Sequence, residues 1–222
     1  MEAVIKVGGS LSEYPECLRR LCRSLSGLVR VHPFLVLPGG GMFADVVRVL
    51  DRRFGLSDAA AHRMAVLGMD IYGLFLSDLT PNSRICYSLG EAERLSKSGT
   101  LPILLPSRLV FREDQLEHSW DVTSDSIAAW VAGLLHVEKL ILVTDVDGVF
   151  TEDPKRSRDA EFVGEIRASE LLEWGERTSV DRFLPRLLLR ERLDCFVVNG
   201  RYPERVEAVL EGRGSVYTRI KA

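Results

Sequence analysis

The sequence lacks the features of a nucleic-acid-binding, membrane-spanning or disulfide-stabilised protein. Its 222 residues carry a net charge of -3, which leaves no broad basic surface. The four cysteines include no CxxC pair and the four histidines are scattered, so neither a zinc site nor a disulfide framework is indicated. No apolar run is long enough to span a bilayer. We therefore expect a cytoplasmic protein with reduced cysteines, no dedicated metal site, and neither a nucleic acid nor a membrane as partner.

The GxxxxGK[ST] motif of P-loop proteins is also absent. A different glycine motif is present, because Gly39, Gly41 and Ala44 satisfy G-x-G-x-x-A, which is typical of dinucleotide-binding proteins. That motif also needs an acidic residue at the end of the next strand, whereas Asp58, at about the expected spacing, begins a helical pattern. A nicotinamide-dependent oxidoreductase stays open as an alternative, as does a non-catalytic nucleotide-binding protein.

Hydrophobic residues make up 46% of the chain, enough to form a full core in one domain over residues 1–222. Apolar runs and helical patterns alternate along the chain, which predicts an α/β domain with a mainly parallel sheet covered on both faces. The predicted strands are 3–7, 34–37, 103–105, 109–111, 139–143, 194–198 and 215–218. The predicted helices are 15–28, 42–54, 57–79, 123–135, 168–174, 180–192 and 203–210.

Two of the predicted strands end in glycine turns. Gly8 and Gly9 follow the first strand, and residues 39–41 follow the second. Glycine allows the backbone to approach a ligand closely, and the N-terminus of a following helix attracts anions, so both turns are predicted phosphate cradles. Lys6 lies inside the first apolar strand, where its ammonium either faces an anion site or reaches solvent at a sheet edge.

Polar groups also follow the strand at 139–143. Thr144, Asp145 and Asp147 would lie at the carboxyl end of that strand, where open α/β sheets bind ligands, so they are predicted to meet a nucleotide and its cation. Asp125 lies in the first turn of the helix at 123–135. Two interpretations of Asp125 stay open: it caps the helix, or it holds the ammonium of Lys6 beneath a transferring phosphoryl group.

Taken in order, these segments resemble the motifs of the amino acid kinase superfamily. The matching segments are Lys6-Val7-Gly8-Gly9-Ser10, Pro38-Gly39-Gly40-Gly41, Thr123-Ser124-Asp125, and Thr144-Asp145-Val146-Asp147-Gly148-Val149-Phe150 with Asp153-Pro154-Lys155. The ordered set is far more specific than any single motif. The resemblance implies a three-layer αβα sandwich and an ATP-dependent kinase that uses Mg²⁺. It also implies an acceptor site in the N-terminal half and a nucleotide site in the C-terminal half.

The resemblance further implies roles for individual residues. Lys6 would neutralise charge on the γ-phosphoryl group during transfer, and Asp125 would orient Lys6, so no general base is required. The residues that would bind ATP are Gly8, Gly9, Ser10, Thr144, Asp145, Asp147, Phe150, Asp153 and Lys155. The residues that would approach the acceptor and the transferring group are Gly39, Gly40 and Gly41. Superfamily relatives usually form homo-oligomers, and the small residues of the helix at 57–79 suit either a subunit contact or internal packing.

The sequence departs from the carboxylate-phosphorylating branch of the superfamily. Residues 178–185 contain no lysine where that branch has a second one, and they resemble the corresponding segment of uridylate kinases. Arg182 or Arg186 is either a substitute or a surface charge. The segments from Leu37 to Asp45, from Ala61 to Gly73, and from Trp120 to Ser126 resemble the small kinases of methanofuran biosynthesis. Those kinases convert the phosphomonoester of 5-(aminomethyl)-3-furanmethanol to its diphosphate; a uridylate kinase is the nearest alternative.

A small phosphomonoester of this kind carries a primary amine, a flat ring and a phosphate. Its site needs a carboxylate or an aromatic face for the ammonium, and N–H or arginine donors for the phosphate. Candidates for the amine are Asp45, Asp70 and Asp121, candidates for the phosphate are Arg48 and Arg63, and Thr123 is a further acceptor-site candidate. Each charged candidate is also compatible with an ordinary surface role on a helix. His62 is predicted to be structural.

Overall fold

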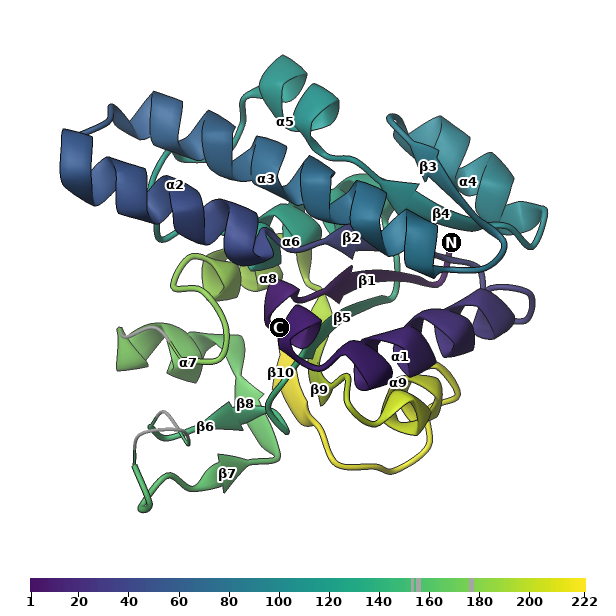
Figure 1. The fold of residues 1–222 in the computed structure, drawn as a ribbon. Helices are drawn as coiled ribbons and strands as arrows, with labels where there is room; N and C mark the ends of the chain where they lie inside the picture. The colour runs from purple at the N-terminus through teal and green to yellow at the C-terminus, as the bar shows by residue number, and fades with distance from the viewer. Residues whose placement is uncertain (153, 155–156, 176–177) are drawn as a thin grey trace.

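The computed structural model describes residues 1–152, 154, 157–175 and 178–222, and a sheet of eight strands lies at the centre of this part of the chain (Figure 1). In spatial order the strands are β3 (Ser83–Cys86), β4 (Leu101–Leu104), β2 (Phe34–Pro38), β1 (Ala3–Val7), β5 (Lys139–Thr144), β9 (Asp194–Asn199), β10 (Thr218–Lys221) and β8 (Glu165–Arg167). Neighbouring strands are parallel except that β10 runs antiparallel to β9. The predicted α/β fold with a mainly parallel sheet is confirmed. A small antiparallel pair, β6 (Val149–Phe150) and β7 (Phe162–Val163), projects from the sheet.

Helices cover both faces of the sheet, which gives the three expected layers (Figure 1). A short 3₁₀ helix, η1 (Gly9–Glu13), follows β1. The α-helices are α1 (Pro15–Leu28), α2 (Gly41–Phe54), α3 (Asp58–Leu79), α4 (Leu89–Lys97), α5 (Ser107–Glu113), α6 (Ser124–Leu135), α7 (Ala168–Trp174), α8 (Leu184–Glu191) and α9 (Pro203–Leu210). One face is covered by α1 and α9, and the other by α4 to α8. Helices α2 and α3 pack against each other as an antiparallel pair.

The strand β1 is central to the sheet, between β2 and β5, and all five of its residues are buried. Burial on both faces explains its continuous apolar run. Because side chains alternate along a strand, Val4 packs into the core beneath α6 whereas Ile5 packs into the core beneath α1. Lys6 therefore shares the face of Val4 and is directed toward α6.

Local sequence signals set the limits of the α2–α3 pair. Gly55 ends α2 in the left-handed conformation, with a φ of 65°, which glycine adopts without steric cost. Ser57 begins α3 as its N-cap, and its Oγ accepts a hydrogen bond from the backbone N–H of Ala60 at 3.3 Å. The small-residue face of α3 packs internally, since an added Cβ on Gly68 would lie 3.2 Å from the backbone N of Ala44. Of the two interpretations of this face, internal packing is confirmed.

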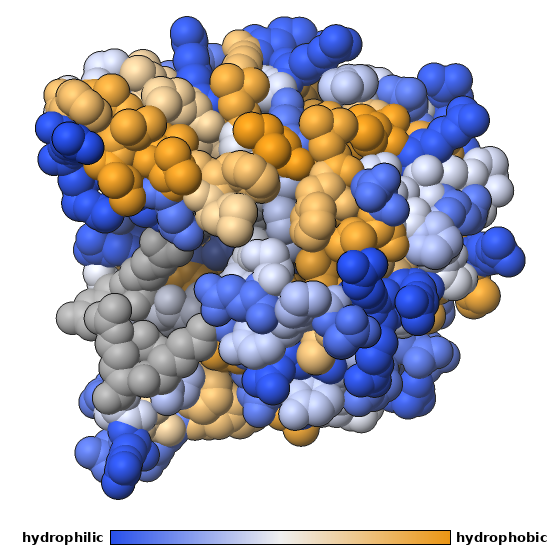
Figure 2. Space-filling model, viewed as in Figure 1, coloured by the Kyte–Doolittle hydropathy of each residue, from blue (hydrophilic) through white to orange (hydrophobic). Residues whose placement is uncertain are grey.

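The opposite, outward faces of α2 and α3 are apolar. Figure 2 shows hydrophobic surface gathered over these two helices. The residues that form it, all between 42% and 66% exposed, are Met42, Val46, Val49 and Phe54 on α2, and Leu67, Ile71, Leu74 and Phe75 on α3. Among the described residues, no helix is both long enough and apolar enough to cross a bilayer.

Three sequence-based assignments differ from the structure. The predicted strand at 109–111 was wrong, because these residues belong to α5, where Leu109 and Val110 are buried on one side of the helix. A three-residue apolar run does not distinguish the two states. The last strand is Thr218–Lys221 rather than 215–218, and the helix predicted at 180–192 begins at Leu184. Neither β3 nor α4 was predicted from the sequence.

Candidate functional site

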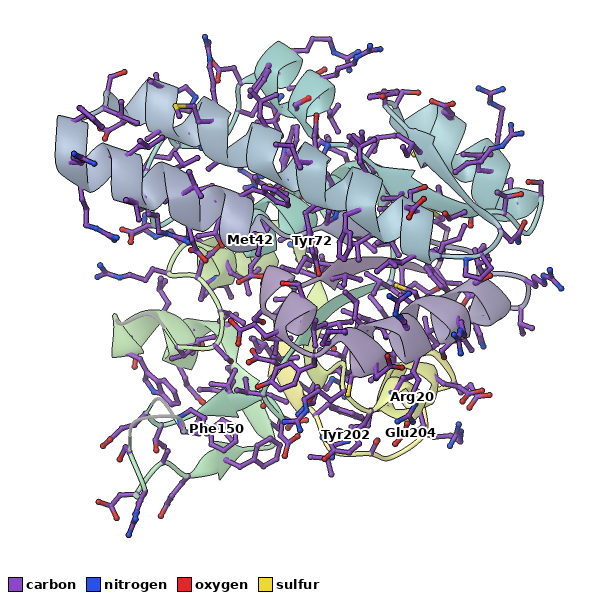
Figure 3. All side chains as sticks on the ribbon, viewed as in Figure 1. Arg20, Met42, Tyr72, Phe150, Tyr202 and Glu204 are labelled. Atoms are coloured by element: carbon purple, nitrogen blue, oxygen red, sulfur yellow. The ribbon has the colours of Figure 1, made fainter. Side chains whose placement is uncertain are left out.

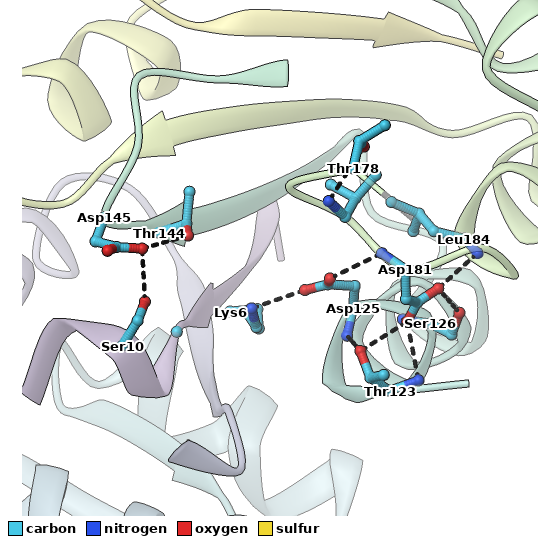
Figure 4. Close-up of polar contacts among 12 residues, drawn as sticks. Lys6, Ser10, Thr123, Asp125, Ser126, Thr144, Asp145, Thr178, Asp181 and Leu184 are labelled. Carbon is cyan, nitrogen blue, oxygen red and sulfur yellow. Dashed lines mark hydrogen bonds and ion pairs between the residues drawn. The ribbon is translucent and has the colours of Figure 1, made fainter. Parts of the chain in front are cut away.

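The strand β1 and the first turn of α6 together form a buried ion pair. The Nζ atom of Lys6 lies 2.7 Å from Oδ1 of Asp125, and the two side chains are 11% and 7% exposed (Figure 4). Thr123 caps α6, and its Oγ1 accepts a hydrogen bond from the backbone N–H of Asp125 at 3.5 Å. Thr123 rather than Asp125 is therefore the N-cap of α6, so the capping interpretation of Asp125 was wrong. Asp125 lies in the first turn of the helix and pairs with the ammonium of Lys6, as the other interpretation predicted.

A second buried carboxylate, Asp181, holds this helix start in place. Its backbone N–H donates to Oδ2 of Asp125 at 3.2 Å (Figure 4). The partner of Lys6 is thereby connected to the segment before α8. The Asp181 side chain accepts hydrogen bonds from the backbone N–H groups of Thr123, Ser126, Phe183 and Leu184 and from the hydroxyls of Thr123 and Ser126. Burial and the nearby charge of Asp125 raise the pKa of Asp181, and the hydrogen bonds from Ser126 and Thr123 oppose that rise.

The two glycine turns lie against each other beside the ion pair. A Cβ added to Gly9 would lie 2.0 Å from Cα of Gly41, so the contact leaves no room for a side chain. Gly41, the first residue of α2, has a φ of 52°, which also favours glycine. The hydroxyl of Tyr72, labelled in Figure 3, donates to the carbonyl of Gly8 at 3.2 Å and ties α3 to this turn. The N-terminus of α2 thus meets the end of β1 next to Lys6.

The end of β5 forms the other side of this region. The Ser10 hydroxyl donates to Oδ1 of Asp145 at 2.9 Å, a contact that joins the first glycine turn to β5 (Figure 4). Asp147 accepts from Nδ2 of Asn199 at 2.9 Å and from Arg205 at 2.6 Å. Partial burial would raise the pKa of Asp147, but these two hydrogen bonds outweigh it and hold that pKa below its ordinary value. Phe150, labelled in Figure 3, stacks edge-on against Phe162 in the β6–β7 pair.

A cavity of about 250 Å³ opens where these elements meet. Eleven residues singled out from the sequence line it: Lys6, Gly8, Gly9, Ser10, Gly40, Gly41, Asp45, Arg48, Thr123, Asp125 and Thr144. The cavity extends from the glycine turns along α2 to Arg48, whose guanidinium pairs with Asp45 at 2.7 Å and lies 4.8 Å from the centre of the Trp120 ring. Strands and helices far apart in the sequence therefore contribute to one site.

Other predicted site residues lie outside the lining of this cavity within the described part of the chain. The carboxylate of Asp70 accepts hydrogen bonds from the backbone and the hydroxyl of Ser107, and Arg63 lies over the ring of Phe111. Asp121 lines a separate hollow and lies 3.7 Å from Arg182. Gly39 and Asp145 adjoin the cavity through Gly9 and Ser10, which line it, whereas Asp147 and Phe150 contact residues outside the lining. Asp153 and Lys155 lie outside the described residues.

The cavity is also lined by residues that were not predicted to belong to the site. Asp58, His62, Trp120 and Ser179 also line the cavity, along with apolar residues of α3. Asp58 and His62 lie one turn apart at the start of α3, a spacing that could have indicated a shared face. Burial and the neighbouring His118 lower the pKa of His62. His62 was predicted to be structural, and its place in the lining shows that it also borders the site.

The described residues contain no group of three or more histidine, cysteine, aspartate or glutamate side chains placed to hold a metal ion. Their polar groups instead converge around the glycine turns and the Lys6–Asp125 pair. Backbone N–H groups at the start of α2, together with one ammonium, form an arrangement suited to phosphate oxygens. The end of the cavity beside the glycine turns is therefore suited to an anionic group.

Comparison with known proteins agrees with this arrangement. The family model described as "Amino acid kinase family" matches residues 1–199. The [5-(aminomethyl)furan-3-yl]methyl phosphate kinase of Methanocaldococcus jannaschii is 34% identical over 219 residues, covering 98% of this chain and 96% of that protein. A uridylate kinase of Methanobrevibacter smithii is 27% identical and covers 96% of each chain. The crystal structure of the Archaeoglobus fulgidus uridylate kinase superposes with a TM-score of 0.77 over 99% of this chain and 100% of that chain, at 23% identity, which shows a shared fold.

Proposed function

The chain belongs to the amino acid kinase family, and from that premise we propose that it is an ATP-dependent kinase acting on a small phosphomonoester. The acceptor that we propose is [5-(aminomethyl)furan-3-yl]methyl phosphate, which the reaction converts to the corresponding diphosphate of methanofuran biosynthesis. The M. jannaschii relative supports this acceptor, since its 34% identity extends over nearly the whole of both chains. The uridylate kinase relatives make UMP the alternative acceptor.

One observation carries the kinase proposal: the Lys6–Asp125 ion pair borders the cavity in which both glycine turns meet. In the proposed reaction an oxygen of the acceptor phosphate attacks the γ-phosphorus of ATP. The bond from that phosphorus to the β,γ-bridging oxygen breaks, and ADP leaves with the bridging oxygen. Lys6 neutralises the negative charge on the transferring group, and Asp125 holds the ammonium in position. Phosphoryl transfer depends mainly on positioning and charge neutralisation, so no general base is needed.

We assign the acceptor site to the N-terminal half of a single domain and the nucleotide site mainly to the C-terminal half. Gly8, Gly9 and Ser10 would contact the phosphates of ATP, and Gly39 to Gly41 would face the acceptor. The remainder of the nucleotide pocket would consist of Thr144, Asp145, Asp147, Phe150, Asp153 and Lys155. The contact of Ser10 with Asp145 supports this division, because it joins the phosphate turn to the nucleotide side of the sheet.

Mg²⁺ would enter with ATP and supply further neutralisation of phosphate charge. Magnesium in such sites is bound mostly by substrate phosphates and water, with one or two carboxylates from the protein. Asp145, which accepts a hydrogen bond from the Ser10 hydroxyl beside the first glycine turn, is a carboxylate that fits this pattern. The four cysteines are all free, which supports our proposal that the protein acts in the cytoplasm, where thiols stay reduced.

A direct assay tests the acceptor. The purified protein is incubated with MgATP and either the furan phosphate or UMP, and ADP release is measured. We expect the higher kcat/KM with the furan phosphate. A higher value with UMP would overturn the acceptor and leave the kinase proposal standing. If neither acceptor releases ADP, protection against melting by MgATP favours a non-catalytic nucleotide-binding protein, and protection by NADH alone favours an oxidoreductase.

The variant Lys6→Met tests the role of the ammonium in the same assay. It removes the charge from the cavity, so we expect kcat to fall by a factor of about 10² to 10³. Lys139→Met is the matched control: Lys139 is also a strand lysine, but its ammonium donates to the carbonyls of Val209 and Leu210. The control should keep its kcat, and melting curves report whether each variant is folded. An unchanged kcat for Lys6→Met would contradict the kinase mechanism.

A further inference from the structure

The part of the cavity away from the glycine turns is bordered by the first half of α3. Asp58, Ala61, His62, Ala65 and Met69 all line it, at intervals of three or four residues that place them on one face of the helix. The cavity also follows α2 from Gly41 to Arg48, which corresponds to roughly 10 Å along the helix axis at 1.5 Å per residue. An acceptor phosphate held near Gly41 would therefore direct the rest of the acceptor toward this stretch of α3.

His62 is the buried polar side chain in this stretch. It is 7% exposed, and its Nε2 atom is buried without a hydrogen-bond partner among the described residues. A buried polar atom without a protein partner is unfavourable, and a ligand group in the adjoining cavity could pair with it. The ring stacks on His118 with centroids 4.7 Å apart, so one of its faces is already covered. Burial and His118 lower the pKa of His62, which favours the neutral imidazole.

The charges around the cavity indicate which kind of ligand group would pair with Nε2 of His62. Lys6 is paired with Asp125, and Arg48 with Asp45. The remaining charged residue of the lining, Asp58, makes no ion pair within the described residues. The end of the cavity bordered by α3 therefore carries one negative charge without an ion-pair partner in the described part of the chain, located one helical turn from His62. That combination attracts a cation and offers it a hydrogen-bond acceptor.

We propose that His62 is a specificity-determining residue that recognises a primary ammonium at the far end of the acceptor. Its Nε2 lone pair accepts a hydrogen bond from the ammonium, and the Asp58 carboxylate at the mouth of the cavity supplies the compensating charge. The inference rests on the proposed function, because it concerns the same acceptor site. It assigns the amine to different residues from those that the sequence indicated, since Asp45 is already paired with Arg48, and Asp70 and Asp121 lie outside the cavity.

The test compares two acceptors: the furan phosphate and an analogue in which a methyl group replaces the aminomethyl group. The quantity measured is the preference, which is the ratio of kcat/KM for the amine to kcat/KM for the analogue. His62→Phe keeps a planar ring against His118 but removes the nitrogen, so the preference should fall about 10-fold to 100-fold, the range for a hydrogen bond to a charged group. His62→Gln retains a hydrogen-bonding group near Nε2 and should recover part of the preference.

Two carboxylate variants complete the test. Asp58→Asn should lower the preference less than His62→Phe does, and more at low than at high salt, because Asp58 is exposed. Asp78→Asn, at the far end of α3, is the matched control and should leave the preference unchanged.

If His62 has only a structural role, His62→Phe will have a changed melting temperature and an unchanged preference. That result would overturn the inference. A preference lost in Asp45→Asn and kept in His62→Phe would also overturn it. If the wild type turns over neither acceptor, the proposed function fails and the inference fails with it.

Discussion

Lys6 is a charged side chain in a strand whose other residues are fully buried. An ammonium in that position is stable because Asp125 lies 2.7 Å away and is itself held by the backbone of Asp181. Removing one partner of such a buried pair typically costs about 3–5 kcal/mol, because the other charge is left uncompensated. Both partners are therefore tied to one geometry, which is the property that a group neutralising a transferring phosphoryl must have.

At the residue scale we predict that Gly9→Ala destabilises the protein. The new methyl group would meet the backbone of Gly41 at 2.0 Å, and a backbone atom cannot move aside as a flexible side chain can. Overpacking of this kind costs typically about 1–3 kcal/mol, and kcat should fall as well because the two turns are pushed apart next to Lys6. Urea denaturation measures the first effect and the ADP-release assay the second.

Gly27→Ala is the matched control for this change. Gly27 lies near the end of α1, and an added Cβ there would meet nothing within 4 Å. Alanine is more favourable than glycine in a helix by about 0.5–1 kcal/mol, so the control should be as stable as the wild type or slightly more so. Equal stability of Gly9→Ala and Gly27→Ala would show that the two glycine turns do not need their close contact.

Site residues could be predicted from the sequence where the residue type is unusual for its secondary structure. A lysine is unusual in a buried apolar strand, and glycine turns directly after two strands are unusual as well. The structure places Lys6, Gly9 and Gly41 together in the lining of one cavity. His62 could not be identified in this way, because a histidine in an amphipathic helix is locally ordinary. Its distinguishing features are the missing partner of Nε2 and the stacking on His118, and both depend on contacts distant in the sequence.

At the scale of elements, Asp181 joins the starts of two helices. Its carboxylate accepts backbone N–H groups of Thr123 and Ser126 at the start of α6, and of Phe183 and Leu184 at the start of α8. A carboxylate at a helix N-terminus satisfies free N–H groups and is favoured by the helix dipole. One side chain therefore fixes the relative positions of α6, which carries Asp125, and α8.

We predict that Asp181→Ala loses about 1–4 kcal/mol of unfolding free energy, the sum expected from two helix caps. The kcat should also fall, because the backbone N–H at position 181 would no longer be held against Oδ2 of Asp125. The measurements are urea denaturation and the ADP-release assay. Asp194→Ala is the control: it breaks the partly exposed ion pair with Arg219, worth about 0–1 kcal/mol, and should leave kcat unchanged. A fully stable Asp181→Ala would contradict the capping role.

Helices α1 and α9 could be predicted from the sequence because their apolar residues recur at helical spacing. The limits of α1 and α9 agree with the predicted 15–28 and 203–210, and Ser57 was correctly predicted to cap α3. The short α5 was mistaken for a strand because Leu109 to Phe111 spans less than one helical turn. The order of the strands in the sheet could not be predicted from local sequence patterns. Strand β10 lies between β9 and β8, and these pairings depend on contacts between residues that are distant in the sequence.

At the scale of the whole molecule, the layers bring the site together and leave one surface uncovered. The sheet places the ends of β1 and β5 side by side, and α2 begins against them. The outward faces of α2 and α3 carry eight exposed large apolar residues, a concentration that on soluble proteins usually marks an interaction site. We propose that a second copy of the chain covers this surface, because a twofold axis lets one apolar face pair with itself.

The variant Ile71→Glu tests this proposal. Ile71 is 47% exposed on α3 within the apolar surface, and a glutamate there would place a charge inside the subunit contact, where its desolvation is unfavourable. The wild type should have the mass of a dimer or larger homo-oligomer by light scattering, and the variant should fall toward the 24.9 kDa of one chain. Leu189→Glu, on α8 and 38% exposed, is the matched control and should keep the wild-type mass. A wild type of single-chain mass, or an Ile71→Glu variant that keeps the oligomer, would refute a subunit contact through α2 and α3.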